Sequence, residues 1–422
     1  MTSDQPISKD VALNDLDEES SSSSTKTGEI LKPFKVRFRE LVFREFIENF
    51  TPAYFGCVLG VGISANILYN FPYPSEWLRV CGQIMFGVTV IFFLVCTFSC
   101  IIGFCYYPER IAMYHIHPLH AAFMAVYVMG FITIINFIHY LVGESHSIFV
   151  WVLWWIAVFM SAYCSCIIFF FAFISKFNKP TSLEHMHSVV LLPVVTLAVV
   201  SSSGHVVSNS LHSLDHKVIT EVIAIIFWGV CVVMGAGFMP IYYARLIIYK
   251  LPNSALILTN FLPVGLFGQC SYSIYLFGVN MYNLIPDKMV GTAFLVSCGL
   301  FSTVLLGFGY FSTFLGAVSI LSKVKPFAKK PNPTFTTKYG LLTWHKGFWA
   351  MNFPLGTMCL ASGEVGRGAV GNYPLLFFKI ISCIYAVVLF LVTLGNLLGV
   401  FLHVCDCLKE LFTKNENTKE MV

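Results

Sequence analysis

Long apolar stretches separated by short polar segments make up most of this chain. A helix needs about 20 apolar residues to cross about 30 Å of hydrocarbon. Ten stretches meet this length, at 51–70, 77–106, 117–142, 147–175, 186–212, 218–249, 253–282, 289–321, 345–363 and 373–404. The pattern therefore predicts an all-α integral membrane protein with ten transmembrane helices.

The two ends of the chain differ from this body. Residues 1–31 are polar and include the run Ser20–Ser24, so we expect a disordered tail. Residues 32–50 interleave basic and aromatic side chains, which predicts an amphipathic helix on the membrane surface, with a plain juxtamembrane linker as the alternative. We expect no cleaved signal peptide. The transport domain is placed at 51–405, and residues 406–422 form a C-terminal tail.

Composition agrees with the membrane class. Hydrophobic residues make up 57% of the chain and charged residues 11%, with a mean hydropathy of +0.75. Soluble domains typically carry about 25% charged residues. A net charge of +4 without a basic soluble module gives no reason to expect nucleic acid as a partner.

The fourteen cysteines lie mostly in apolar stretches. The pairs Cys164–Cys166 and Cys405–Cys407 lack a second Cys/His pair at zinc spacing, so we expect no metal site and no cofactor.

Basic residues between the spans are distributed unevenly. Alternate loops and the C-terminal tail carry Arg110, Lys176, Lys179, Arg245, Lys250, Lys323, Lys325, Lys329, Lys330, Lys338, Lys409, Lys414 and Lys419. The opposite loops carry Arg79, Lys217, Lys288, Arg367 and Lys379. Because loops rich in Lys and Arg remain in the cytoplasm, both termini are predicted to be cytoplasmic.

Odd-numbered spans contain breakers or small polar residues, whereas even-numbered spans are longer and bulkier. Interrupted helices in alternation often mark a transport path, although small residues also serve close helix packing. We therefore predict five helical hairpins, with the odd helices around a central pore. The candidate pore-lining or kink residues are Asn136, Pro193, Ser201, Ser202, Ser203, His205, Pro263, Gln269, Pro354 and Thr357.

The ninth span carries the sharpest candidate. Pro354 is predicted to kink the helix, because proline lacks an N–H and clashes with the preceding turn. Phe353 stands just before it, and we predict that its ring closes the pore; the alternative is a phenylalanine that faces lipid. His345 and Lys346 open this span and form a candidate cytoplasmic mouth for anions.

The chemistry of the spans favours anions. Carboxylates are nearly absent from them, since Glu184, Glu221 and Glu364 are placed at span edges, so neither a cation path nor a proton relay is indicated. Hydroxyls, amides and freed N–H groups can solvate a small anion. His205 either binds that anion or is a hydrogen-bonded packing residue.

Three segments resemble the tellurite-resistance/dicarboxylate transporter family, which includes fungal sulfite exporters, malate permeases and plant slow anion channels. They are Gly60–Arg79, Thr133–Phe137 and His345–Met358, and the resemblance extends over roughly 40–405. It is strongest to the sulfite-exporting fungal members. The resemblance implies ten helices in five hairpins around a pore, a homotrimer, and a pore-closing phenylalanine on the ninth helix, which matches Phe353.

The resulting hypothesis is a plasma-membrane protein that exports sulfite or bisulfite. Transport of malate or another dicarboxylate, of nitrate or of chloride by the same fold is the alternative. Because no Arg lies within the middle of a span, a guanidinium clamp for a dicarboxylate is not indicated, which favours a small inorganic anion. An enzyme is disfavoured because no paired carboxylates, metal cluster or nucleotide loop emerges.

Overall fold

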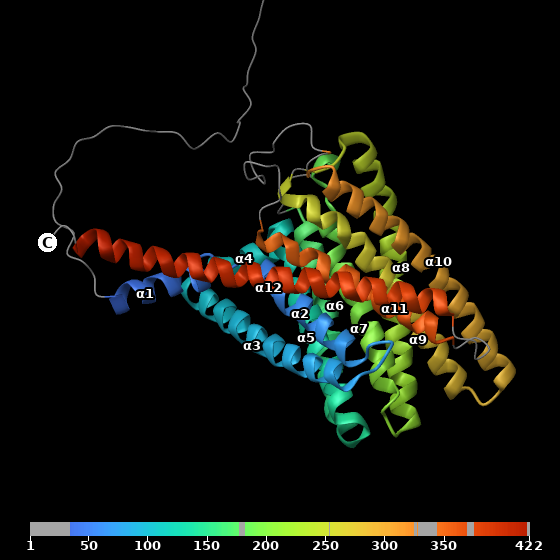
Figure 1. Cartoon of the computed structure of the whole chain (residues 1–422). Coiled ribbons are helices and arrows are strands. Elements are labelled where there is room, and N and C mark those ends of the chain that lie inside the picture. The colour runs from blue at the N-terminus through green and yellow to red at the C-terminus, as the bar shows by residue number, and fades with distance from the viewer. Residues whose placement is uncertain are drawn as a thin grey trace, which may run out of the picture.

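The computed structural model describes residues 34–176, 182–252, 254–324, 327, 344–368 and 375–419. These residues form helices joined by short turns (Figure 1). The predicted disordered tail, 1–31, lies outside the described residues. The helices are α1 (Phe34–Phe43), α2 (Phe55–Tyr69), α3 (Glu76–Tyr106), α4 (Glu109–Ile116), α5 (Pro118–Val142), α6 (Ser147–Ala162), α7 (Leu192–Ser208), α8 (Leu214–Tyr249), α9 (Leu262–Leu284), α10 (Lys288–Leu321), α11 (Asn352–Arg367) and α12 (Leu376–Lys419).

Apolar helical segments confirm a multi-pass membrane protein. In the part of the chain that the structure describes, eight segments are long and apolar enough to cross a bilayer. One of them, Pro118–Ile174, contains both α5 and α6, which pack on each other after a turn at Gly143, where φ is +54°. The segment that contains α11 is not among the eight. The exact number of ten crossings therefore remains a prediction.

Within the described residues, α2, α5, α7, α9 and α11 form a closed ring in which each helix contacts the next and α11 returns to α2. We call them the ring helices. In the most apolar 18-residue window of each segment, 67% of the residues are buried for α2, 100% for α7 and 83% for α9. We call α3, α6, α8, α10 and α12 the outer helices. The buried share is only 22–33% for the segments of α3, α8, α10 and α12. The predicted hairpins, with odd helices inside and even helices outside, are confirmed.

The three candidate prolines lie near the starts of ring helices. Pro193 and Pro263 lie at the second positions of α7 and α9, and Pro354 is the third residue of α11. A 3₁₀ segment precedes each of these helices: Ser188–Leu191, Ser254–Phe261 and Lys346–Met351. The N–H groups of a first turn have no partner inside the helix, so proline costs little there. The prolines therefore lie where 3₁₀ geometry gives way to the α-helices of the ring, and the kink at Pro354 stays a prediction.

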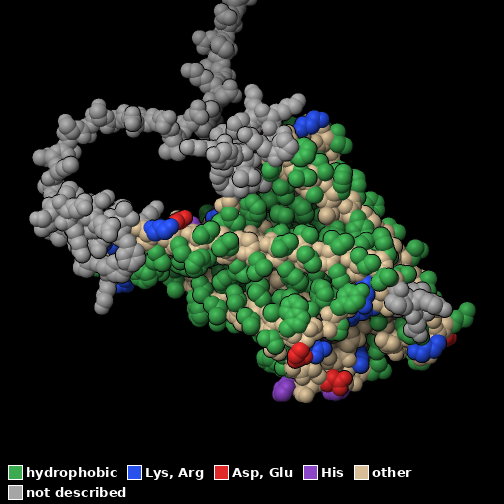
Figure 2. Space-filling model, viewed as in Figure 1, with side chains coloured by type: hydrophobic (Ala, Val, Ile, Leu, Met, Phe, Trp, Pro, Cys, Tyr) green, Lys and Arg blue, Asp and Glu red, His purple; other side chains and the backbone are tan. Residues whose placement is uncertain are grey.

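The ring helices all begin at one end of the bundle. A 3₁₀ segment, Pro52–Tyr54, also precedes α2. The segment before α11 contacts those before α2 and α9, and the one before α7 contacts the one before α9. We call this the Lys346 end and the opposite one the Arg367 end. Side chains on the visible outer face are mostly hydrophobic, with charged ones near its ends (Figure 2), as expected for a surface in contact with lipid.

The juxtamembrane segment and the C-terminal tail both contain helix. Residues Phe34–Glu48 form α1 and a short π-helical turn, and α12 continues to Lys419. Figure 1 shows α1 beside the C-terminal part of α12, and the two helices are in contact. Arg110, counted above only as a loop charge, donates to the backbone oxygens of Ile47 and Glu48, both at 2.6 Å. This guanidinium fixes the end of the juxtamembrane segment against α4.

A close contact between α9 and α11 gives a test of the ring. A Cβ added at Gly268 would lie 2.7 Å from Thr357 Oγ1 and 3.0 Å from the backbone nitrogen of Met358. We predict that Gly268→Ala destabilises the protein by about 1–3 kcal/mol, because backbone must move to accept the methyl group. Gly307→Ala on α10 is the control, since a Cβ there meets nothing within 4 Å. Thermal unfolding in detergent should show a lower Tm for Gly268→Ala alone; equal Tm values would contradict the proposed packing.

Candidate functional site

Phe353 lies inside the bundle, where α11 begins. Its side chain is 6% exposed, so the ring does not face lipid. A Cβ added at Gly265 of α9 would lie 3.3 Å from Cδ1 of this ring. The ring of Phe353 thus reaches from the first turn of α11 to the first turn of α9, where Gly265 has no side chain. Its role as a gate remains a prediction.

A buried polar cluster beside Phe353 was missed by the sequence analysis. Asn352 Nδ2 donates to Thr393 Oγ1 at 2.7 Å, and Asn396 Nδ2 donates to Asn352 Oδ1 at 2.8 Å. The hydroxyls of Thr393 and Ser64 are 2.9 Å apart. These bonds tie the start of α11 to α12 and, through Thr393, to α2, so both amide atoms of the residue before Phe353 are held by α12. Asn396 also accepts from the indole of Trp344 at 3.1 Å.

His345 and Lys346 lie together at the start of the 3₁₀ segment that leads into α11. His345 Nδ1 accepts a hydrogen bond from the N–H of Gly347 at 3.1 Å. Lys346 Nζ lies 4.8 Å from the ring centroid of Tyr54.

The positive charge at this end has a second source in the backbone. The N-terminus of a helix carries roughly half a positive charge, because its first N–H groups have no partner within the helix. All ring helices present this terminus to the Lys346 end, together with the Lys346 ammonium. The arrangement attracts anions to this end of the ring.

The predicted serine run of α7 bonds to its neighbours in the ring. The hydroxyls of Ser201 and Ser273 lie 2.8 Å apart. Gln269 Nε2 donates to Ser202 Oγ, and Ser203 Oγ donates to Asn136 Oδ1 at 2.6 Å. The structure thus brings these candidates together, but as bridges that join α7 to α9 and α5. Thr357 donates to its own helix, at the carbonyl of Pro354 (2.9 Å).

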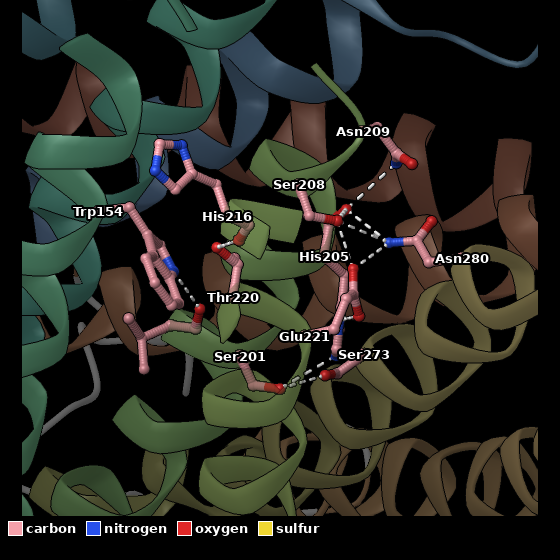
Figure 3. A network of polar contacts seen from close by, with 11 residues as sticks. Trp154, Ser201, His205, Ser208, Asn209, His216, Thr220, Glu221, Ser273 and Asn280 are labelled. Carbon is pink, nitrogen blue, oxygen red and sulfur yellow. Dashed lines mark hydrogen bonds and ion pairs between the residues drawn. The ribbon is translucent and has the colours of Figure 1, made fainter. Parts of the chain in front are cut away.

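His205 belongs to a fully buried network (Figure 3). Its Nδ1 lies 2.6 Å from Glu221 Oε2. The other carboxylate oxygen, Oε1, accepts from Asn280 Nδ2 at 2.6 Å and from Ser208 Oγ. His205 and Glu221 are 0% and 1% exposed. The network joins α7, α8 and α9 near the Arg367 end.

Glu221 is more deeply buried than its place near the start of the predicted span suggested. Because α8 begins at Leu214, Glu221 lies two turns inside the helix, and its side chain is 1% exposed. The carboxylate that it offers to His205 is an anionic partner supplied by the protein itself. This geometry favours the packing interpretation of His205 over binding of a transported anion.

Two cavities lie at the Arg367 end, and neither was predicted. One has a volume of about 90 Å³ and reaches Tyr140 and Tyr272 inside the ring. The other has a volume of about 430 Å³ and is lined by Arg79, Arg367 and Lys379. The sequence signal for the larger cavity is the small set of five basic residues in the loops on this side of the protein. The fold gathers three of these five, Arg79, Arg367 and Lys379, around that cavity.

The Glu221 network gives a stability test. We predict that Glu221→Ala destabilises the protein by about 3–5 kcal/mol, because it leaves three buried donors without their acceptor. Glu76→Ala is the control, since the side chain of Glu76 is 86% exposed. The measurement is thermal unfolding of the purified variants. A Glu221→Ala protein as stable as Glu76→Ala would show that the network contributes nothing.

Comparison with known proteins places this architecture in a family. Residues 49–401 match the family model SLAC1, described as voltage-dependent anion channel. The chain is 44% identical over 392 residues to Sulfite efflux pump SSU1 of Candida albicans, covering 92% of this chain and 81% of that protein. It is 31% identical over 388 residues to Sulfite efflux pump SSU1 of Saccharomyces cerevisiae, covering 80% and 83%.

A more distant relative is Uncharacterized transporter MJ0762 of Methanocaldococcus jannaschii, which is 24% identical over 321 residues and covers 74% of this chain and 84% of its own. The family match extends over most of the chain and includes all the ring helices. The chain therefore belongs to the SLAC1 family of voltage-dependent anion channels.

Proposed function

We propose that the protein exports sulfite or bisulfite across the plasma membrane by channel-like permeation through the ring of helices. The closed ring, with every helix beginning at the Lys346 end, is the observation that carries transport. The substrate rests on the relatives, because a sulfite efflux pump is 44% identical over 92% of the chain. Membership of an anion channel family supports a transporter rather than an enzyme.

The proposed orientation places the Lys346 end and both termini in the cytoplasm. The distribution of Lys and Arg between the loops supports this orientation. The contact between α1 and α12 is consistent with both ends of the chain on one side of the membrane. An anion is then drawn from the cytoplasm by the helix N-termini and Lys346, and leaves at the Arg367 end.

Phe353 is the proposed gate. In this mechanism its ring, lying against Gly265, blocks the narrow start of the path as a steric and dewetting barrier. Rotation of the ring away from α9 opens the path. The hydrogen bonds of Asn352 to α12 keep the backbone in place while the side chain moves.

Malate, another dicarboxylate, nitrate or chloride is the alternative substrate. The basic side chains near the cavities lie at the Arg367 end rather than in the serine-rich middle of the ring, which supports a small inorganic anion over a clamped dicarboxylate. We also propose a homotrimer, as the family resemblance implies, which molecular mass measurement in lipid nanodiscs would test.

The substrate is tested with proteoliposomes that contain the purified protein alone. Release of sulfite is compared with release of malate, chloride and nitrate, while voltage and pH gradients are varied independently. We expect sulfite to leave fastest and its rate to follow voltage. Faster release of malate would overturn the substrate, and release no faster than from protein-free liposomes would overturn transport.

The gate is tested by Phe353→Ala in the same vesicles. Removing the ring should raise the sulfite flux by roughly tenfold or more, since a barrier lowered by about 1.4 kcal/mol speeds passage tenfold. Phe314→Ala on α10 is the matched control, because that side chain is 64% exposed on the outer face. If a folded Phe353→Ala protein conducts at the wild-type rate, Phe353 is not the gate.

A further inference from the structure

The two cavities at the Arg367 end meet at one cationic side chain. Both are lined by Asn70, Pro72, Gly363 and Arg367. The smaller cavity adds Glu364 and the tyrosines inside the ring, and the larger adds Arg79 and Lys379. Arg367 therefore stands where the inner cavity opens into the outer one.

Arg367 already holds a carboxylate in this position. Its Nη1 lies 3.0 Å from Glu364 Oε1, one turn earlier on α11. The side chain of Glu364 is only 17% exposed, whereas that of Arg367 is 63% exposed. Glu364 is the acidic side chain in the described lining of either cavity. A negatively charged oxygen thus occupies the inner side of the guanidinium, and the outer side is accessible.

We propose that Arg367 is the centre of a binding site for a small oxyanion, and that the Glu364 carboxylate is a tethered competitor which the oxyanion displaces. The proposal deepens the proposed function by giving the exported anion a site at the exit. Binding of an oxyanion at Arg367 does not depend on transport, so the site can be tested without a transport assay.

The chemistry of the site fits an oxyanion. A guanidinium carries five N–H donors in a planar fork that matches two oxygens of one anion. The carboxylate of Glu364 and the oxygens of sulfite present the same kind of acceptor to this fork. Lys379, whose Nζ lies 4.0 Å from the ring centroid of Tyr73, adds positive charge to the same cavity, as does Arg79.

The cavities also have room for such an ion. The smaller one, at about 90 Å³, exceeds the roughly 30 Å³ that liquid water gives to one molecule. An anion of four heavy atoms can therefore stand between the tyrosines and Arg367, and the larger cavity leads away from it.

Competition with a tethered carboxylate has a functional consequence. Permeation requires binding that is strong enough to admit an ion and weak enough to release it. An unopposed cluster of Arg79, Arg367 and Lys379 would retain an oxyanion at the exit. Glu364 weakens that binding without removing the positive charge that draws the ion through the ring.

Binding is tested by isothermal titration calorimetry, in which the anion is titrated into the full-length protein in detergent at constant ionic strength. The probes are sodium sulfite and sodium sulfate. Arg367→Gln should weaken sulfite binding by roughly tenfold or more, which corresponds to about 1.4 kcal/mol. Glu364→Gln should tighten it by roughly two- to fivefold, as expected when a partly exposed ion pair no longer competes.

A double variant keeps the test decisive. Arg367→Gln alone leaves Glu364 without its ion-pair partner, whereas Glu364→Gln/Arg367→Gln removes both charges and leaves neither buried alone. It should bind as weakly as Arg367→Gln, because Glu364 acts only by competing for Arg367. If Glu364→Gln still tightens binding in the absence of Arg367, or weakens it in its presence, the competitor is excluded.

Lys288→Gln is the matched control. Lys288 is exposed on the same side of the protein, but it contacts Tyr282 and lines neither cavity. Its substitution should leave sulfite binding unchanged; a loss equal to that of Arg367→Gln would reduce the effect to general surface charge and overturn the site.

If the binding pattern holds but vesicles release no sulfite, transport fails and the site stands. If vesicles release sulfite while Arg367→Gln binds it normally, the site fails and transport stands.

Discussion

Close approach of the ring helices is the constraint on which the rest of the structure depends. In hydrocarbon, helices gain nothing by hiding apolar surface from lipid, so they associate through close packing and hydrogen bonds. Glycine provides the packing: Gly268 lies against the backbone of α11, and Gly130 against Val58 of α2. Because the ring closes, each of its helices packs between two others. The outer helices pack against the ring and separate it from the lipid. The position of Phe353 against Gly265 follows from this spacing.

Hydrogen bonds between side chains on different helices also hold the bundle together. Polar side chains that would be costly in lipid are paired across helices: Ser203 with Asn136, Asn352 with Thr393, and His205 with Glu221. These residue types are also those that a transport path would use, so composition cannot separate the two roles. Their observed partners lie on neighbouring helices, so these bonds also join the helices to one another. The charged chemistry is found instead at the two ends of the ring, around Lys346 and Arg367.

Much of the fold could be predicted, because long apolar runs directly record burial in the membrane. The role of proline could not. Pro354 interrupts an apolar stretch in either case, and only the 3₁₀ segment before it shows that a helix begins there. The burial of Glu221 could not be predicted, because it depends on where α8 begins and on which side of the helix faces α7. Arg79 is far from Arg367 and Lys379 in the chain, so no local pattern could reveal that the three surround one cavity.

The common direction of the ring helices has a consequence for how such proteins diverge. The charge that the helix starts give to the Lys346 end resides in backbone N–H groups, which every residue type except proline possesses. No single side-chain replacement can delete it, and no change of pH can neutralise it. Attraction for anions is thus inherited with the backbone. Arg367 and Glu364, in contrast, act through their side chains. Selectivity among anions that depends on these two residues can therefore change through a single substitution. A chain built in this way can exchange its cargo over evolutionary time without rebuilding its scaffold.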